Sequence, residues 1–561
     1  MGVNSLSERT SLRDKVIEKS FAGLAVIQFL ALCYFNLFLL KQHMGGDAAS
    51  VFHNAIEMWN QRTLILSDWQ YPTTLNIDTP APLAALLYGM IGDIFISYGI
   101  ANIIFIILLI IVFWKFMGLF DISYLGKMVA LNFLICPHLM IYDLNNSLSY
   151  GSMLLYDGGW YSTKLLESLL VLWTAAKFYR GETKKSLIVF SILGAMMCGA
   201  SSGYWLLGTV ICPLLLWLVV EELWQGRSMG DTFKTNACRY VLGLGFLSIA
   251  VKFVTGKLFH VTTLDASMLL VTLPKLWSNL QALLIGYLDV QSALPMIGAV
   301  KIFSNHGLLY MVYFSFAMLM LLAVVSRLRK EWLDRADPNW RMLLFFIAGN
   351  LLILALLETN YSEGIAESRY YIYIYAIGLI FLGDFLGKIF AREKSFLVVC
   401  LLLLLFIDIT SSRNYARAKN NVYELSMLAA ELDKYAEEKV VCLFGEELII
   451  DYHRLSAYDK NKIYKNVARY NDEMRKWEDK LRVWGMDENR MYKKVWGDYA
   501  IAQVANSTKG NEVIEQAGDM LIVAKEERLG DLPAEIRSRA ELVHSDFYGY
   551  VIMKYTAASQ R

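Results

Sequence analysis

Asp47 is the first residue of this sequence whose type and position suit chemistry. It follows Gly45 and Gly46, just after the apolar run of residues 21–40. Apolar and aromatic residues then recur at spacings of three and four, which predicts an amphipathic helix lying along a membrane surface. Asp47 is therefore either at the N-cap of that helix or a carboxylate held at the membrane surface to accept a proton.

Three more carboxylates lie in the polar segments that follow. Asp78 stands in "NIDTP", and Asp143 and Asp157 belong to the polar segment 142–160. A turn is the alternative role for Asp78, and also for Asp157, which two glycines follow. Two carboxylates brought together would suit a divalent cation such as Mg²⁺ or Mn²⁺, and the sequence leaves that metal requirement open.

Composition shows which kind of element must position these residues. Hydrophobic residues make up 56% of the 561 residues and charged residues 19%, whereas an ordinary soluble domain has about 45–50% and about 25%. The net charge of +1 gives no reason to expect nucleic acid as a partner, and the seven cysteines form no close pair typical of a zinc site or disulfide framework. Apolar runs of about 20 residues recur along the chain. They predict a polytopic α-helical membrane protein, with crossings near 21–40, 98–118, 124–141, 160–178, 186–199, 204–222, 240–258, 307–326, 341–358, 370–390 and 395–410.

Basic clusters determine the predicted orientation, because lysine and arginine concentrate in cytoplasmic loops. These clusters occur at 177–185, 327–335 and 388–394. With the N-terminus inside, the C-terminal part of the chain lies outside, as do the polar segments 41–80, 142–160 and 259–306. Residues 82–99 would break this pattern as a full crossing, so we expect a re-entrant or half-membrane helix that contains Gly92 and Asp93.

The composition changes after residue 410. A charged segment with helical periodicity and short strand patterns such as "KVVCLFG" predict a soluble α/β domain over 411–561, on the outer face of a membrane domain over 1–410. Asp451 and His453 stand within the outer domain in "GEELIIDYHR". No nucleophile or metal motif frames them, so we interpret them as part of a solvated face.

The order of these motifs resembles the GT-C glycosyltransferases. A first crossing, then Asp47, an amphipathic helix leading to "LSDWQYP", and "DTPAPLAALLYG" are similar to the opening of these enzymes, above all of their protein O-mannosyltransferase and aminoarabinose-transferase branch. Further along, "EGIAESRYYIYIYAIGLIFLG" resembles the segment that begins a late helix in the same enzymes. The resemblance covers residues 1–410. It implies a GT-C-like fold with about 11–13 transmembrane helices and an outer C-terminal domain.

The resemblance also implies a reaction and a location. Members of this family transfer a monosaccharide from a polyprenyl-phosphate-linked donor to an acceptor on the outer face of the membrane. One carboxylate deprotonates the acceptor hydroxyl in an inverting displacement, and positive charge or a metal stabilises the leaving phosphate. The acceptor is an envelope glycan, a lipid-linked saccharide or a protein. The expected location is a cell membrane, with the bacterial inner membrane preferred, a cytoplasmic N-terminus and an extracytoplasmic C-terminal domain.

Carried over residue by residue, the resemblance makes Asp47 the base and Asp157 the second catalytic carboxylate. Arg369 is the expected phosphate contact, because guanidinium binds phosphate through two parallel hydrogen bonds; a helix-end anchor is its alternative role. His53 is a weaker candidate, with a water-facing position as the alternative. The remaining candidates for substrate binding are Asp78, Asp143 and Tyr370.

Two positions depart from the family pattern. Ala48 stands where family members often have a glutamate, and Thr79 replaces the lysine that helps to neutralise the lipid phosphate. Several explanations stay open: another cation takes over that charge, the donor is held differently, or activity has been lost. In the last case the chain is a catalytically inactive, GT-C-shaped scaffold that binds polyprenyl lipid or a partner complex.

Overall fold

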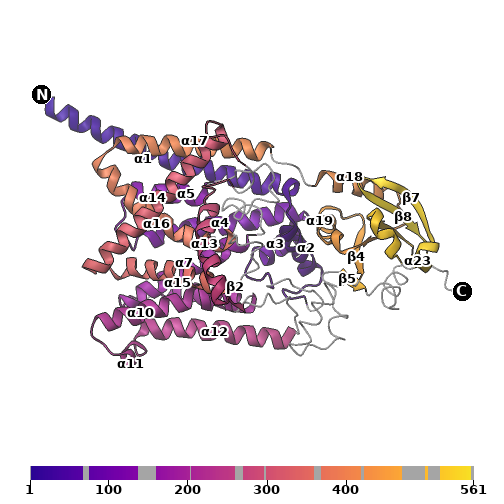
Figure 1. Ribbon diagram of the computed structural model, residues 1–561, viewed down its shortest axis with the longest axis horizontal. Coiled ribbons are helices and arrows are strands. Elements are labelled where there is room, and N and C mark those ends of the chain that lie inside the picture. Colours follow the sequence, from indigo (N-terminus) through magenta and orange to yellow (C-terminus); the bar gives the residue numbers. More distant parts are fainter. Residues whose placement is uncertain are drawn as a thin grey trace.

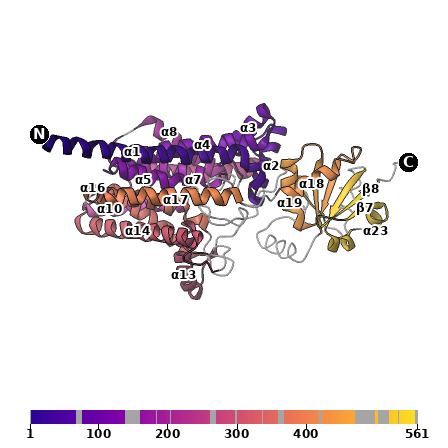
Figure 2. The same cartoon turned by 90° about the horizontal axis from the view of Figure 1, so that it is seen from above.

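A computed structural model describes residues 2–66, 75–136, 159–182, 184–201, 204–259, 269–295, 299–335, 337–358, 368–417, 422–469, 499–502, 519–532 and 534–556. A bundle of helices forms the larger part, and a smaller α/β domain lies at one end of its long axis (Figure 1). The N-terminus lies at the opposite end of the molecule from this domain (Figures 1 and 2).

Among the described residues, eight helices are long and apolar enough to cross a membrane. The first begins in α1 (Gly2–Tyr34) and continues through a π-helical turn and a 3₁₀ turn to His43. The others are α4 (Ile94–Met117), α9 to α10 (Tyr204–Trp224), α12 (Asn236–Phe259), α14 (Asn305–Asp334), α15 (Pro338–Leu356), α16 (Ile372–Arg392) and α17 (Ser395–Arg417). These helices confirm the predicted crossings near 21–40, 98–118, 204–222, 240–258, 307–326, 341–358, 370–390 and 395–410.

The other three predicted crossings form helices of a different character. α5 (Tyr124–Ile135) has 12 residues and α8 (Lys185–Ser201) has 17, fewer than the roughly 20 that a straight crossing needs. α7 (Trp160–Tyr179) has 20 residues but carries two lysines and a glutamate within its length. It packs inside the bundle against α4, α8 and α12, so neighbouring helices shield its polar side chains.

The segment predicted to be a half-membrane helix is interrupted at the expected place. α3 (Ala81–Ile91) ends at Gly92, whose φ of 77° is a left-handed conformation that glycine adopts without strain. Asp93 then caps α4, since its carboxylate accepts hydrogen bonds from the backbone N–H groups of Phe95 (2.9 Å) and Ile96 (3.1 Å). The short helix is therefore residues 81–91. The part of the prediction that included 94–99 was wrong, because this cap makes those residues the first turns of α4.

α5 and α16 approach each other closely at a pair of glycines. A Cβ atom on Gly126 would lie 2.4 Å from the carbonyl oxygen of Gly383, and one on Gly383 would lie 2.5 Å from the carbonyl oxygen of Gly126. Small residues at such a crossing let two helix backbones touch, which is a common way of packing helices in membranes. This contact holds α16, and with it the segment that contains Arg369, against the first half of the bundle.

The predicted amphipathic helix is present as α2 (Gly46–Asn60) and runs across the end of the bundle (Figure 1). Its N-cap is Gly45, and Asp47 lies inside the first turn. The helix is more deeply buried than the prediction of a surface helix allowed, because α3 and α4 contact it from the bundle and α19 (Ile449–Tyr458) contacts it from the C-terminal α/β domain. Ala48 belongs to its buried apolar side and is 1% exposed.

The segment before α16 is tied to the predicted outer segment 259–306. That segment contains α13 (Leu273–Val290) and β1 (Leu269–Leu270), which pairs with β2 (Leu357–Glu358). The amide of Asn279 donates to the carbonyl oxygens of Ala355 (3.1 Å) and Leu357 (3.2 Å). α13 also contacts the 3₁₀ turn η6 (Ser368–Tyr371).

The C-terminal part confirms the predicted α/β composition. Its sheet has the strand order β5-β4-β3-β6-β8-β7, with parallel pairing from β5 to β6 and antiparallel pairing of β8 with both β6 and β7. The central strands β3 and β6 are apolar throughout, as expected for strands covered on both faces. Its elements are α18 (Tyr423–Leu432), β3 (Val440–Phe444), α19, β4 (Ile463–Arg469), β5 (Tyr499–Ala502), β6 (Met520–Ala524), α23 (Ala534–Ser538), β7 (Ala540–Phe547) and β8 (Tyr550–Tyr555).

Candidate active site

A buried polar cluster lies where the loop before α3 meets α7 and α8. Its members are Asp78, Thr163, Lys164 and Ser201, and we refer to them as the Asp78 cluster. The ammonium of Lys164 lies 3.6 Å from Asp78 Oδ2, and the two side chains are only 10% and 3% exposed. The hydroxyl of Ser201 donates to Asp78 Oδ1, and that of Thr163 donates to the Asp78 carbonyl oxygen, both at 2.5 Å.

The local sequence holds Asp78 in place through a tight turn. Asn76 has a positive φ of 58°, a conformation that asparagine tolerates better than most residues. The Thr79 hydroxyl donates to the Asn76 carbonyl oxygen (2.6 Å) and accepts from the N–H of Ala81 (3.1 Å) at the start of α3. Asp78 therefore lies in a turn, as one of the two alternatives predicted, and its carboxylate is buried against Lys164; its role in substrate binding stays a prediction.

Gly159 brings the start of α7 against this turn. Its φ is 66°, and a Cβ atom there would lie 2.6 Å from Pro80 Cγ and 2.9 Å from Asn102 Oδ1. Only glycine satisfies both the conformation and the space. Asp157 precedes Gly159 by two residues in the sequence, but Asp157 and Asp143 lie outside the residues that the structure describes.

Aromatic rings extend the Asp78 cluster towards α16. The Lys164 ammonium is 5.9 Å from the ring centroid of Trp205, and the Trp205 ring lies 5.3 Å from that of Tyr373 in the first turn of α16. Arg369 and Tyr370 precede Tyr373 in η6. Tyr370 is half-buried, whereas of Arg369 the structure describes the backbone position at the entrance to α16.

α19 of the C-terminal α/β domain packs against the N-terminal half of α2, on which Asp47 lies. Arg454 Nε donates to the Met44 carbonyl oxygen at 3.2 Å. A Cβ atom on Gly46 would lie 3.2 Å from the side chain of Ile450, so the two helices touch there. Both contacts lie within the three residues that precede Asp47. They place the backbone of Asp47 at the junction between the bundle and the C-terminal domain.

Two histidines meet in the same interface. His53 Nδ1 and His453 Nδ1 are 3.3 Å apart, one from α2 and one from α19, and their side chains are 5% and 2% exposed. The water-facing alternative for His53 and the solvated-face interpretation of His453 were therefore wrong, because the tertiary contact removes both rings from water. Burial in the first place, and then the neighbouring His53, hold the pKa of His453 well below its ordinary value.

The sequence contained a signal for Lys164 that the prediction missed. Lys164 and Glu167 both fall within the predicted crossing 160–178, and ionisable residues inside a membrane segment mark functional sites more often than structural ones. Glu167 is 4% exposed, and its carboxylate occupies space that a Cβ atom on Gly194 would fill. Within the described ranges no group of three or more His, Cys, Asp and Glu side chains is arranged to hold a metal ion.

The chain combines a transmembrane helix bundle, a helix across the end of the bundle, a buried acid at the entry to the next helix and an α/β domain beyond. This arrangement is the GT-C glycosyltransferase fold. It is similar over nearly the whole chain to ArnT from Cupriavidus metallidurans. For the apo structure the TM-score is 0.57 at 10% identity, covering 97% of this chain and 99% of ArnT. For ArnT bound to undecaprenyl phosphate it is 0.52 at 12% identity, covering 96% and 99%. No protein-family model matches the sequence, and no curated protein sequence matches it.

Proposed function

We propose that this protein is an integral membrane glycosyltransferase that transfers a monosaccharide from a polyprenyl-phosphate-linked donor to an extracytoplasmic acceptor. The observation that carries the proposal is the fold shared along nearly the whole chain with ArnT, one structure of which holds undecaprenyl phosphate. The Asp78 cluster supports it, because a buried, charged site next to the membrane entrance of α3 suits a phosphate-linked substrate better than a purely structural core.

The proposed reaction is an inverting displacement. The acceptor hydroxyl oxygen attacks the anomeric carbon while the bond from that carbon to the donor phosphate oxygen breaks. The hydroxyl proton passes to the Asp47 carboxylate, and polyprenyl phosphate leaves with the bonding electron pair. Asp157 is proposed as the second catalytic carboxylate, which orients the acceptor, and Arg369 as a contact to the leaving phosphate.

Lys164 is proposed to supply the charge that Thr79 lacks. Thr79 is 1% exposed, and its hydroxyl is engaged in the turn before α3. Lys164 comes from α7 and reaches the carboxylate of the adjacent residue, Asp78. A cation is thus held beside the position of the missing lysine but comes from another helix, which supports the explanation that another cation took over its role.

The proposed orientation places the outer domain in the extracytoplasmic space. The basic segment 327–335 ends α14, which joins α10 and α15 through ion pairs of Arg341 with Glu221 (2.5 Å) and Glu331 (3.3 Å). In Figure 1 the link between α10 and α12 lies at the end of the bundle away from the outer domain. A cytoplasmic location of this basic end follows from the positive-inside rule. The acceptor is then an envelope glycan, a lipid-linked saccharide or a protein.

The alternative is an inactive scaffold of the same fold. Ala48 favours it, because this position lies in the apolar core and has no carboxylate that could assist Asp47. The test is transfer of radiolabelled sugar from polyprenyl-phosphate donors in membranes containing wild type or Asp47→Asn, with the exposed Asp121→Asn as the matched control. Transfer lost only in Asp47→Asn supports the enzyme and the base. Transfer unchanged in Asp47→Asn refutes the role of Asp47, and no transfer by wild type with any donor favours the scaffold.

A further inference from the structure

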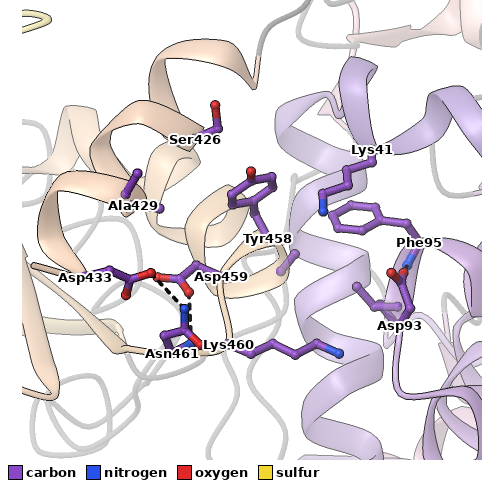
Figure 3. A pocket seen from close by; sticks show the side chains of 13 residues that line it. Lys41, Asp93, Phe95, Ser426, Ala429, Asp433, Tyr458, Asp459, Lys460 and Asn461 are labelled. Carbon is purple, nitrogen blue, oxygen red and sulfur yellow. Dashed lines mark hydrogen bonds between the residues drawn. The ribbon is translucent and has the colours of Figure 1, made fainter. Parts of the chain in front are cut away.

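Two features outside the Asp78 cluster are open to a partner, a pocket and an apolar helix face. The pocket, of about 410 Å³, lies where α18 and α19 meet the bundle (Figure 3). Its lining combines the carboxylates of Asp93, Asp433 and Asp459 with the ammonium groups of Lys41 and Lys460. This mixture of charges selects no class of ligand. The helix face belongs to α13 and is apolar along its length.

The residues of α13 divide among three faces, since successive residues of a helix are about 100° apart. The face against the bundle is buried and contains Asn279, Ala282, Gly286 and Val290. A second face is apolar and exposed. Its members, which we call the α13 stripe, are Leu273 (83% exposed), Trp277 (68%), Leu280 (44%) and Leu284 (58%). Their spacing of three or four residues gathers them within about 60° of the helix circumference, away from the buried face.

The third face of α13 carries polar side chains. Ser278 and Gln281 are exposed there, between the α13 stripe and the buried face. A helix with protein on one side, exposed apolar groups on a second and exposed polar groups on a third suits the surface of a bilayer at the edge of a membrane protein. In water on every exposed side, four large apolar side chains would instead cost free energy by their exposure.

The position of α13 in the fold fits the same surface. α13 runs across the direction of the spans at the side of the bundle (Figures 1 and 2). It packs against α15, and its Asn279 amide donates to the carbonyl oxygens of Ala355 and Leu357, on either side of Leu356. In this last part of α15, Leu352 and Leu356 are 57% and 39% exposed. The α13 stripe therefore continues the apolar surface that the end of a span presents to lipid.

We propose that α13 is an interfacial helix whose stripe inserts into the bilayer surface on the side of the C-terminal α/β domain. The partner is the lipid at the boundary between headgroups and acyl chains, a depth at which tryptophan, here Trp277, is enriched. Because α13 contacts η6, the seating of α13 in the bilayer fixes the depth of the segment that contains Arg369. This role does not depend on whether the protein transfers a sugar.

The test measures which medium surrounds each face of α13. The full-length protein is reconstituted in phosphatidylcholine vesicles with a spin label on one introduced cysteine, and the signal of labelled wild type, which has seven cysteines, is subtracted. Oxygen, which concentrates in hydrocarbon, and a water-soluble nickel chelate are the two relaxing agents. Labels on Trp277→Cys and Leu284→Cys should respond more strongly to oxygen. The label on Gln281→Cys, the matched control on the same helix, should respond more strongly to the chelate.

Two further positions calibrate the response. Leu352→Cys marks the lipid-facing surface of α15, and Lys434→Cys marks an exposed position of α18 in the C-terminal α/β domain. Ratios of the two responses at positions 277 and 284 that match the Leu352 reference support the proposal. Ratios that match the Lys434 reference overturn it, because they place the stripe in water. A weak response to both agents also overturns it, because protein would then cover the stripe.

If the cysteine variants do not accumulate, Trp277→Phe decides, because phenylalanine keeps the side chain apolar. Tryptophan emission from wild type and from this variant is compared in vesicles of brominated phosphatidylcholine, whose bromine atoms quench by contact. The difference between the two emission spectra belongs to Trp277, and it should be quenched by the brominated lipid and not by acrylamide in the water. Quenching by acrylamide alone overturns the proposal.

Discussion

Replacing Lys164 with methionine tests the buried charge pair of the candidate site. At 3.6 Å from Asp78 Oδ2, the ammonium contributes an attraction of about 4–5 kcal/mol at an effective dielectric constant of about 20. Methionine keeps the length and apolar stem of lysine but leaves the Asp78 carboxylate buried, with the Ser201 hydroxyl still donating to it. Removing one partner of a buried pair costs about 3–5 kcal/mol, so we expect Lys164→Met to lower the free energy of unfolding by that amount.

A double-mutant cycle isolates this interaction from the loss of packing. Asp78→Asn keeps an oxygen that accepts from Ser201 and removes the charge, so it strands the Lys164 ammonium at a similar cost. The double variant is neutral and should unfold within about 1–2 kcal/mol of wild type, because a buried pair contributes little net stability over neutral groups. Unfolding is measured by titration with SDS, followed by tryptophan fluorescence. Lys185→Met, at an exposed position, is the control and should change stability by less than about 0.5 kcal/mol.

Additive effects of the two substitutions would refute the charge pair. The same cycle also separates structure from function when sugar transfer is measured alongside. If Lys164 contacts the donor phosphate, the double variant recovers stability but not transfer. Recovery of both would leave Lys164 as a structural partner of Asp78 and remove it from the proposed mechanism.

Two further substitutions test the helix packing and the domain junction. Gly383→Ala should lower the free energy of unfolding by about 1–3 kcal/mol, because its Cβ would lie 2.5 Å from the Gly126 carbonyl oxygen. The control Gly243→Ala, whose Cβ would have no neighbour within 4 Å, should be tolerated. Equal SDS midpoints for the two variants would contradict this packing. Because the pKa of His453 is held well below its ordinary value of 6.5 by burial and then by His53, the unfolded chain binds a proton that the folded chain excludes. Stability is therefore complete above about pH 6.5 and declines as the pH falls below it. His453→Phe should flatten this decline between pH 7.5 and 5.5 in the same titration, and an unchanged decline would assign it to other groups.

Local sequence patterns predicted the framework of the protein because they act through nearby residues. A long apolar run becomes a helix wherever it crosses a bilayer, since each backbone group finds its partner within the same segment. The break between α3 and α4 was also visible, because Gly92 and Asp93 are a helix terminator and a helix cap in direct succession. The α/β character of the C-terminal part followed from the change in composition after residue 410. The exact start of α4 could not be predicted from hydropathy, because hydropathy is averaged over many residues whereas the single cap residue Asp93 fixes where the helix begins.

The candidate site could be predicted only in part for the same reason. Asp78 was identified as a candidate from its motif, but its partner Lys164 was counted within an apolar crossing. His53 and His453 are 400 residues apart in the sequence, and no local pattern says that they meet. The family resemblance singled out Asp47 and Arg369, which the structure places at the start of α2 and at the entrance to α16. Their proposed roles in the reaction stay predictions.

The sequence by itself determined that this chain is a membrane protein with an α/β domain after its last span, because hydropathy and periodicity are properties of single segments. The tertiary structure decided which polar groups lose water together. Burying Lys164, Asp78 or a histidine alone would cost several kcal/mol, and only the folded chain brings a partner from a distant segment to offset that cost. The candidate site therefore depends on contacts between distant segments: the loop before α3 meets α7 and α8, and α2 meets α19.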